Sequence, residues 1–391
     1  MIPGFEFARI PGIHFGPGTF SRLADVVSRI GDRVLVVTGE RSLEASGRWI
    51  QLSESLDRRS VTLFHVRTGR EPSPDDVDRA VSEFRSEDIR VVLAVGGGSV
   101  LDLGKAISAM LPHEKSVTDF LEGIGTEEHS GEKVPFVAVP TTSGTGSEAT
   151  KNAVLSKIGP DGYKKSLRHD NFVPDAAVVD PELILSCPPD VTASTGMDAC
   201  TQLLEALVSP AATPLTDLLA LEGLKSIKDN LVAACTDGAG NVEVRGAMAY
   251  AALLSGICLA NAGLGIVHGL ASPIGGYFPV PHGVVCGTLL ASATRVNIEA
   301  LRREETGDEA LRKYARVGWL FSGRDGTDVT EGCDRLVEVL DEWTEQLDIP
   351  KLGAYGVAES DVSKILDHTG LKNNPVQLDR GDIQRILEDR I

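Results

Sequence analysis

The sequence has few basic residues, no closely spaced cysteines and no uninterrupted apolar run long enough to cross a membrane. Its 391 residues include 38 Lys and Arg against 56 Asp and Glu, which gives a net charge of −18. Such an acidic surface argues against broad contact with nucleic acid or with an anionic membrane, because either partner requires a basic face. It does not exclude an anionic cofactor, which a local pocket of backbone N–H groups can hold.

Six cysteines are scattered along the chain and none stands at C-x-x-C spacing, so neither a zinc ribbon nor a disulfide framework is indicated. We expect reduced thiols in a cytoplasmic protein, mostly filling small buried apolar sites. The opening residues 1–4 lack the basic region of a secretory signal, so no leader is expected. The longest apolar stretch, residues 249–267, is broken by Ser255, Asn261 and glycines, which predicts a buried helix and loop rather than a membrane span.

The first 180 or so residues alternate short β-branched runs with amphipathic stretches. This alternation predicts an α/β unit with a mostly parallel sheet. Ser73 followed by Pro74 is typical of a capped helix start, and the helix is expected to run to about Ser86. A second helix is expected over residues 42–56. The predicted strands are residues 33–38, 60–65, 89–95, 134–139 and 176–179.

Beyond Pro181 the pattern changes to long stretches rich in Ala and Leu with helical spacing. Helices are expected over 197–208, 216–229 and 243–259. Two prolines interrupt the chain at residues 188–189, close to the change of pattern. The length also favours two domains. We therefore predict an α/β dinucleotide-binding domain over 1–185 and an all-helical metal and substrate domain over 186–391, with a ligand cleft between them.

Two glycine-rich segments each follow a predicted strand. Gly96, Gly97 and Gly98 stand between a strand and a helix, with Ser99 as the expected cap. Such a turn lets a helix N-terminus approach a pyrophosphate, although a tight turn without a ligand is the alternative. Residues 140–149 formally match a dinucleotide fingerprint but lie too late in the domain for it. Their hydroxyl side chains instead favour a loop that hydrogen-bonds a polar ligand, the alternative being a plain polar loop.

A candidate metal site is visible in the second half of the chain. Asp198 and Gln202 lie four residues apart on a predicted helix and so share one face. His268 and His282 stand in apolar surroundings marked by glycines. Two such histidines with an aspartate suit a divalent cation, and the alternative is that both are ordinary core histidines.

Taken together, these segments resemble the iron-containing (group III) alcohol dehydrogenase family over nearly the whole chain. Several long motifs occur in the family's order, which makes the resemblance specific. It implies an α/β dinucleotide-binding domain and a helical domain in a dehydroquinate synthase-like arrangement. The matching segments are residues 13–18, 96–105, 140–148, 179–181 and 196–199, those around His268 and His282, and 374–375.

The resemblance also assigns roles. It implies that Gly96, Gly97, Gly98 and Ser99 cradle the pyrophosphate with Asp102 beside it, that Thr141, Thr142 and Thr145 contact the nucleotide, and that Lys164, or alternatively Lys165, lies near the nicotinamide ribose. The implied metal ligands are Asp198, Gln202, His268 and His282, of which Asp198, His268 and His282 are also the implied catalytic residues.

Two positions depart from the family pattern. Gln202 stands where the family has a histidine ligand, and an amide oxygen is a weaker and harder ligand than imidazole. The metal, whether Fe²⁺, Zn²⁺ or Mn²⁺, and the dependence on metal are therefore open. Ser272 replaces a further family histidine, which leaves water, a cofactor ribose hydroxyl or Ser272 itself to pass the proton.

The implied activity is an NAD(P)-dependent interconversion of an alcohol with an aldehyde or ketone by metal-assisted hydride transfer. Gly39 stands where NAD-preferring relatives carry an aspartate that binds the ribose 2′-OH, and Arg41 is nearby, which favours acceptance of NADP. Glu40 weakens that argument. The family also implies a small-molecule alcohol or aldehyde substrate, a homodimer and no nucleic-acid or membrane partner.

Three other functions compete with this one. The first is a specialised aldehyde reductase of the maleylacetate or phosphonoaldehyde type. The second is a dehydroquinate synthase-like lyase, whose phosphorylated substrate requires a basic pocket, and the C-terminal half has few clustered Lys and Arg around His268 and His282. The third is a binding protein that has lost catalysis, for which Gln202 and Ser272 are the argument.

Overall fold

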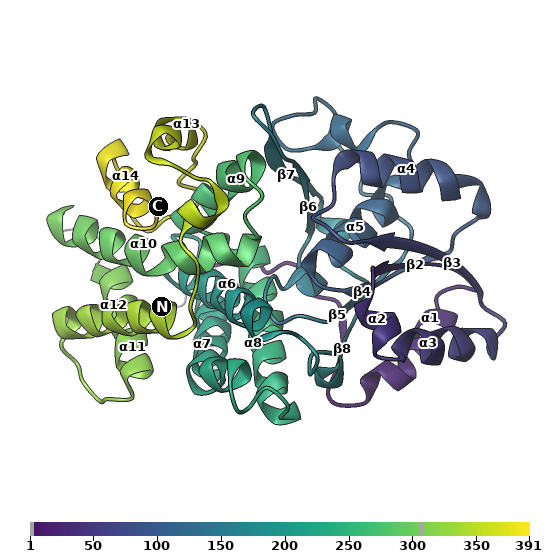
Figure 1. The fold of residues 1–391 in the computed structure, drawn as a ribbon, viewed down its shortest axis with the longest axis horizontal. Helices are drawn as coiled ribbons and strands as arrows, with labels where there is room; N and C mark the ends of the chain where they lie inside the picture. Colours follow the sequence, from purple (N-terminus) through teal and green to yellow (C-terminus); the bar gives the residue numbers. More distant parts are fainter. Residues whose placement is uncertain (1–3, 305–307) are drawn as a thin grey trace.

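The computed structural model describes residues 4–304 and 308–391, and the chain forms an α/β part and a helical part that lie side by side (Figure 1). Both parts agree with the predicted fold class. The α/β part is built on a six-stranded sheet with every neighbouring pair parallel. Its strands are β1 (Gly12–Phe15), β2 (Arg33–Gly39), β3 (Thr62–Thr68), β4 (Val91–Gly96), β5 (Phe136–Pro140) and β8 (Ala176–Val179).

Helices cover both faces of this sheet. Alternate residues of a strand enter different cores: Leu35 and Val37 join the core that includes α4 and α5, whereas Val34 and Val36 join the core that includes α1 and α3. Because β4, β5 and β8 are buried along their whole length, their sequences are almost continuously apolar. The helices are α1 (Leu23–Ser28), α2 (Ser42–Ala45), α3 (Arg48–Asp57), α4 (Pro74–Phe84) and α5 (Gly98–Met110).

The strand order β1-β8-β5-β4-β2-β3 places a topological switch point between β2 and β4. From β2 the chain passes to β3 on one side and then crosses back to β4 on the other side. Loops that leave two such strands diverge, and the carboxyl edge of the sheet at a switch point is where ligands of doubly wound folds generally bind in a crevice. Gly39 and Gly96 end the two strands that flank this crevice.

Local details confirm some predictions and correct others. The start of α4 is capped as expected, because Ser73 Oγ accepts from Asp76 N at 3.2 Å and Asp76 Oδ2 accepts from Ser73 N at 3.1 Å. The helix expected over 42–56 is instead two helices, since Gly47 between them adopts a left-handed φ of 71°. Ser99 does not cap α5, because the N-cap position is occupied by Gly97, two residues earlier, and the helix begins at Gly98.

One sheet was not predicted. The strands β6 (Asn152–Lys157) and β7 (Tyr163–Arg168) form an antiparallel hairpin that is separate from the main sheet. Its Ser156 N donates to Pro72 O at 2.9 Å, and β7 packs against α9 of the helical part. The hairpin therefore bridges the two parts of the chain, as Figure 1 shows.

The second half is helical, as predicted. Two of its helices, α8 and α10, are long and apolar enough to cross a membrane, but 61% and 89% of their apolar windows are buried inside the fold. They are core helices of a soluble protein, which agrees with the expectation for residues 249–267. The helices are α6 (Pro189–Val208), α7 (Pro214–Cys235), α8 (Val242–Ala262), α9 (Ile266–Tyr277), α10 (His282–Glu304), α11 (Asp308–Ser322), α12 (Val329–Gln346), α13 (Val362–Asp367) and α14 (Arg380–Glu388).

The two parts meet backbone to backbone at a pair of glycines. Gly146, in the loop after β5, has a φ of +61°, and Gly256 lies within α8. A Cβ atom on Gly256 would lie 2.2 Å from Gly146 O, and a Cβ on Gly146 would lie 2.5 Å from Gly256 Cα. Only glycine fits at either position, so the loop and the helix are held in direct contact.

Candidate active site

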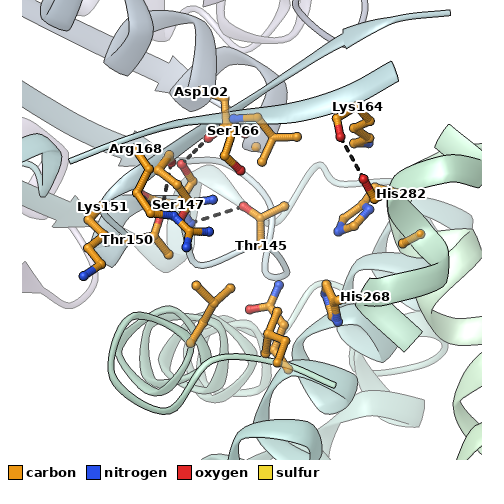
Figure 2. Close-up of a pocket in the computed structure, with 18 of the residues that line it drawn as sticks. Asp102, Thr145, Ser147, Thr150, Lys151, Lys164, Ser166, Arg168, His268 and His282 are labelled. Atoms are coloured by element: carbon orange, nitrogen blue, oxygen red, sulfur yellow. Dashed lines mark hydrogen bonds between the residues drawn. The ribbon is translucent and has the colours of Figure 1, made fainter. Parts of the chain in front are cut away.

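A cavity of about 710 Å³ lies between the α/β part, the hairpin β6–β7 and the helical part. Figure 2 shows Ser147, Thr150, Lys151 and Arg168 on one side, and Lys164 with the two histidines on the other. The cavity has the size of a small-molecule site. It brings together eight residues from both halves of the sequence prediction: Gly98, Ser99, Asp102, Thr145, Lys164, Gln202, His268 and His282.

The remaining predicted nucleotide contacts do not line this cavity but lie along the carboxyl edge of the sheet. They are Gly39, Gly96, Gly97, Thr141 and Thr142. Gly96 pairs with Pro140 in the sheet, and Thr141 N donates to Gly96 O at 2.9 Å, so the two glycine-rich loops leave neighbouring strands together. These residues therefore extend from the cavity towards the crevice between β2 and β4.

The glycine turn before α5 owes its composition to close packing. A Cβ atom on Gly98 would lie 2.6 Å from Thr145 Cγ2, so a side chain there would push the two loops apart. Gly97 has an ordinary φ of −73°, which any residue can adopt. The backbone angles of Gly97 therefore do not require glycine. Because Gly97 has no side chain, a ligand can closely approach the N-terminus of α5, which favours binding of phosphate oxygens.

Asp102 stabilises the hydroxyl-rich loop, residues 140–149, by a hydrogen bond. Its Oδ1 accepts from Ser147 Oγ at 2.6 Å, and its Oδ2 accepts from Val154 N at 3.1 Å. Lys105 also contacts this segment, because its Nζ donates to Ser147 O at 2.8 Å and to Thr150 Oγ1 at 2.9 Å. Burial raises the pKa of Asp102 and lowers the pKa of Lys105 to about 8. One carboxylate oxygen of Asp102 therefore holds the loop at Ser147, and the other holds strand β6 at Val154.

Lys164 and Ser272 are also held by hydrogen bonds. Lys164 Nζ donates to Glu71 Oε1 at 2.7 Å and to Glu71 Oε2 at 2.8 Å. Ser272 Oγ donates to the carbonyl oxygen of Lys164 at 2.8 Å, one of the bonds dashed in Figure 2. The Ser272 hydroxyl hydrogen is therefore already used, which favours water or a ribose hydroxyl over Ser272 for proton transfer.

A cluster of four side chains from three helices forms the candidate metal centre. Asp198 comes from α6, His268 from α9, and His282 and Cys286 from α10. One donor atom from each lies within 4.8 Å of the other three. Asp198 is 1% exposed, and its Oδ1 has no hydrogen-bond partner among the described residues. An orphaned carboxylate oxygen that faces two imidazoles and a thiol fits a bound divalent cation.

The protonation states of Asp198 and His282 suit metal binding. Burial opposes the charge of His268, but its neighbours Cys286, Asp198 and Glu205 raise its pKa well above the usual value, so this ring must release a proton when a cation binds. Burial disfavours the charge of Asp198, but the neighbouring His282 and His268 hold its pKa to about 2. Burial lowers the pKa of His282 to about 4. At neutral pH the aspartate is therefore ionised and His282 is neutral, and these are the forms that ligate metals.

Glu205 orients His268 from behind. Its Oε2 lies 2.7 Å from His268 Nδ1, and its Oε1 accepts from Val267 N at 2.7 Å. Nε2 of the same ring faces Asp198 Oδ1 at 3.4 Å. A carboxylate behind a histidine fixes the ring and its tautomer, as at many metal centres. Glu205 was not among the predicted site residues, although it lies seven residues after Asp198 on the same helix face.

Cys286 was missed as well. It lies four residues after His282, the spacing that singled out Asp198 and Gln202, but it was grouped with the other buried thiols. Gln202 is 2% exposed and lies on the cavity wall, where its Oε1 accepts from Ser255 Oγ at 2.9 Å.

The cavity is more basic than the sequence analysis expected. The scarcity of Lys and Arg holds for the helical part, which contributes Lys372. The N-terminal part, mainly through the unpredicted hairpin, adds four more: Lys151, Lys164, Lys165 and Arg168. Three of these form ion pairs, namely Lys164 with Glu71, Arg168 with Glu122 and Lys151 with Asp170.

Comparison with known proteins gives consistent matches over the whole chain. Residues 11–181 match the model described as iron-containing alcohol dehydrogenase, and residues 192–391 match the C-terminal model of the same family. Long-chain-alcohol dehydrogenase 1 of Geobacillus thermodenitrificans is 33% identical over 97% of this chain and 94% of its own length.

Solved structures agree. A mutant of an archaeal halo-thermophilic Red Sea brine pool alcohol dehydrogenase superposes with a TM-score of 0.91 at 25% identity, covering 100% of both chains. Sulfoacetaldehyde reductase from Bifidobacterium kashiwanohense, solved in complex with NAD⁺, superposes with a TM-score of 0.84 at 26% identity, covering 99% of each chain.

Proposed function

This chain belongs to the iron-containing alcohol dehydrogenase family and is an NAD(P)-dependent oxidoreductase of alcohols and aldehydes, and from that premise we propose which of its residues perform the reaction. Asp198, His268 and His282 hold a divalent cation. The observation that carries this assignment is the convergence of their donor atoms around the unpartnered Asp198 Oδ1, beside a cavity that also reaches the N-terminus of α5.

The fourth ligand position belongs either to Gln202, as the family resemblance implies, or to Cys286. When bound, the cation supplies Lewis-acid polarisation of the substrate oxygen and the nicotinamide supplies the hydride acceptor or donor. The protein's own residues position these groups. Glu205 orients His268, Asp102 and Lys105 hold the loop that carries Thr145, and both histidines direct Nε2 towards Asp198.

The cofactor lies with its pyrophosphate at Gly96, Gly97, Gly98 and Ser99, within reach of Thr141, Thr142 and Thr145. Gly39 at the end of β2 leaves space beside the adenosine ribose, which supports acceptance of NADP. Lys164 serves the nicotinamide end, where its pairing with Glu71 fixes the ammonium group.

Several broader assignments accompany this proposal. We divide the chain into a dinucleotide-binding domain, residues 1–185, and a metal and substrate domain, residues 186–391. The boundary is supported by the last sheet strand, β8 (Ala176–Val179), and by the start of α6 at Pro189. A cytoplasmic homodimer is the assembly that the family resemblance favours, and all six cysteines are free thiols, as such a location requires.

Metal analysis of His268→Ala tests the metal site. Removing one of the nitrogen ligands is expected to abolish stoichiometric metal and turnover with NADH or NADPH, while the control His368→Ala, an exposed histidine on the helical part, retains both. Full metal content in folded His268→Ala protein contradicts the assignment, as does chelator-resistant turnover by metal-free parent enzyme.

A second candidate is a reductase for an aldehyde that carries an anionic group. It is supported by the five basic side chains on the cavity wall, of which Lys165 and Lys372 form no ion pair with described residues at 4.0 Å or less. We expect Lys165→Ala to raise KM for a carboxylated aldehyde and to leave KM for its neutral methyl ester unchanged. Equal effects on both substrates contradict anionic recognition.

A further inference from the structure

We propose that Cys286 is the fourth protein ligand of the metal, as a thiolate, and that Gln202 is not a ligand. This inference rests on the metal site of the proposed function. It keeps Asp198, His268 and His282 as ligands and replaces the amide of Gln202 with the thiolate of Cys286. The position of Cys286 within the cluster carries the argument.

The spacing of the four donors is that of a tetrahedral site. With metal bonds of about 2.0 Å to oxygen or nitrogen and about 2.3 Å to sulfur, tetrahedral angles place nitrogen and oxygen about 3.3 Å apart and sulfur and nitrogen about 3.5 Å apart. Asp198 Oδ1 lies 3.4 Å from His268 Nε2 and 3.8 Å from His282 Nε2. Cys286 Sγ lies 3.6 Å and 3.7 Å from the same two nitrogens. Four of the six donor pairs therefore lie near tetrahedral spacing, and the other two, Asp198 with Cys286 and His268 with His282, lie within 4.8 Å.

The contacts of Cys286 differ from those of other buried cysteines. Cys258 Sγ donates to the Thr216 carbonyl oxygen at 3.6 Å, and Cys333 Sγ donates to the Leu311 carbonyl oxygen at 3.4 Å. These are the contacts of ordinary core thiols. Cys286 instead contacts two imidazole nitrogens beside a carboxylate oxygen that lacks a partner.

Gln202 is poorly placed to compete. The only atom of the Gln202 amide that can ligate a cation is its oxygen, and this atom lies 2.9 Å from Ser255 Oγ, so it has a polar neighbour without any metal. The remaining NH₂ group carries only donors and cannot ligate a cation. Ser255 Oγ also lies 2.8 Å from Ala252 O, and its single hydrogen can be donated to only one of the two oxygens at a time.

A thiolate ligand changes the preferred metal. Cys and His donors suit Zn²⁺, whereas carbonyl and carboxylate oxygens suit Mn²⁺ and other hard ions. The Cys286 thiol releases its proton to solvent when the cation binds, because only the thiolate is a ligand. Zinc in catalytic sites also accepts a fifth ligand, so four protein donors still leave a place for substrate oxygen.

X-ray absorption of the zinc-loaded protein tests the assignment directly. We expect a sulfur shell at about 2.3 Å beside nitrogen and oxygen at about 2.0–2.1 Å. Cys286→Ser should lose the sulfur shell, while the matched control Cys258→Ser should keep it. Cys286→Ser should also weaken Zn²⁺ binding by at least about tenfold, with a smaller effect on Mn²⁺. Gln202→Ala should keep the sulfur shell and bind Zn²⁺ within about threefold of the parent.

The outcomes separate this inference from the proposed function. Stoichiometric zinc with only nitrogen and oxygen neighbours overturns the role of Cys286 but leaves the metal site of the proposed function standing. A sulfur shell that persists in Cys286→Ser overturns it too, since another thiol is then the source. Failure of the parent to bind any divalent cation overturns both. If Cys286→Ser does not fold, the parent spectrum and the Gln202→Ala protein still decide the question.

Discussion

Replacing Glu205 with glutamine is expected to weaken metal binding although Glu205 is not itself a ligand in the proposed site. Val267 N–H requires an acceptor, so the amide oxygen must take the place of Oε1. The amide NH₂ then faces His268 Nδ1, where Oε2 now lies at 2.7 Å. Two donors cannot face each other, so Nδ1 must lose its hydrogen and Nε2 must carry one instead. That hydrogen points into the metal cluster and blocks the ligand atom.

The size of the effect follows from this change of tautomer. Losing the partner behind a metal-bound histidine typically costs roughly 10- to 100-fold in metal affinity, which corresponds to about 1.4 to 2.7 kcal/mol. Stability without metal should change less, because the bond to Val267 N is retained. Competition titration with a chromophoric zinc chelator gives the affinity, and thermal melting with excess chelator gives the stability of the metal-free fold.

A buried carboxylate far from the cluster provides the control. Asp382, at the start of α14, pairs with Arg303 at 2.7 Å, and Asp382→Asn should lower the melting temperature without changing zinc affinity. Zinc affinity of Glu205→Gln within about twofold of the parent would show that the tautomer of His268 is not under the control of Glu205, and the reasoning would then be refuted.

Three further predictions concern the α/β part. Gly97→Val should abolish NAD(P)H binding as measured by fluorescence titration. The melting temperature should stay near that of the parent, because φ is ordinary and a Cβ atom there meets only the Thr142 side chain, with Cγ2 at 3.3 Å. An unchanged titration would remove this turn from the cofactor site. Gly39→Asp should shift the ratio of kcat/KM towards NAD by about tenfold or more, since a Cβ lies an unstrained 3.6 Å from Ser42 Oγ; a ratio within about twofold contradicts the position of the ribose. Asp76→Asn should cost about 1 kcal/mol in urea unfolding at pH 7. Despite partial burial, the capping hydrogen bonds lower the pKa of Asp76 from 3.8 to about 2, so its stabilisation is present above pH 4 and is lost as the pH falls to 2; an equal acid-induced loss in parent and variant refutes the role of the cap.

The sequence was most informative where the determinants of structure are local. The start of α4 follows from Ser73 and Pro74, because a cap and a fixed proline φ act over a few residues. The buried strand β4 follows from its unbroken apolar run. The break in the helix expected over 42–56 was missed, since one glycine inside a helical pattern is usually tolerated and only the structure shows the left-handed turn at Gly47.

What could not be predicted depends on contacts between distant segments. The hairpin β6–β7 was missed because Lys164 and Lys165 interrupt its apolar pattern, and Lys164 finds its partner Glu71 far away in the sequence. Resemblance to the family identified three members of the metal cluster. It did not identify Cys286, whose significance depends on three helices meeting at one point.

The contact between Gly146 and Gly256 has a consequence for how this sequence can diverge. Each glycine removes the space for a side chain at the other, so a first substitution at either position meets the backbone of the opposite half and must displace it. The two positions are therefore expected to stay glycine together or to change together with a shift of α8. The contact between Gly146 and Gly256 is therefore a poor place to enlarge the cavity by engineering. Gly256→Ala would shift the loop around Gly146 relative to α8 before it created any room for a larger substrate.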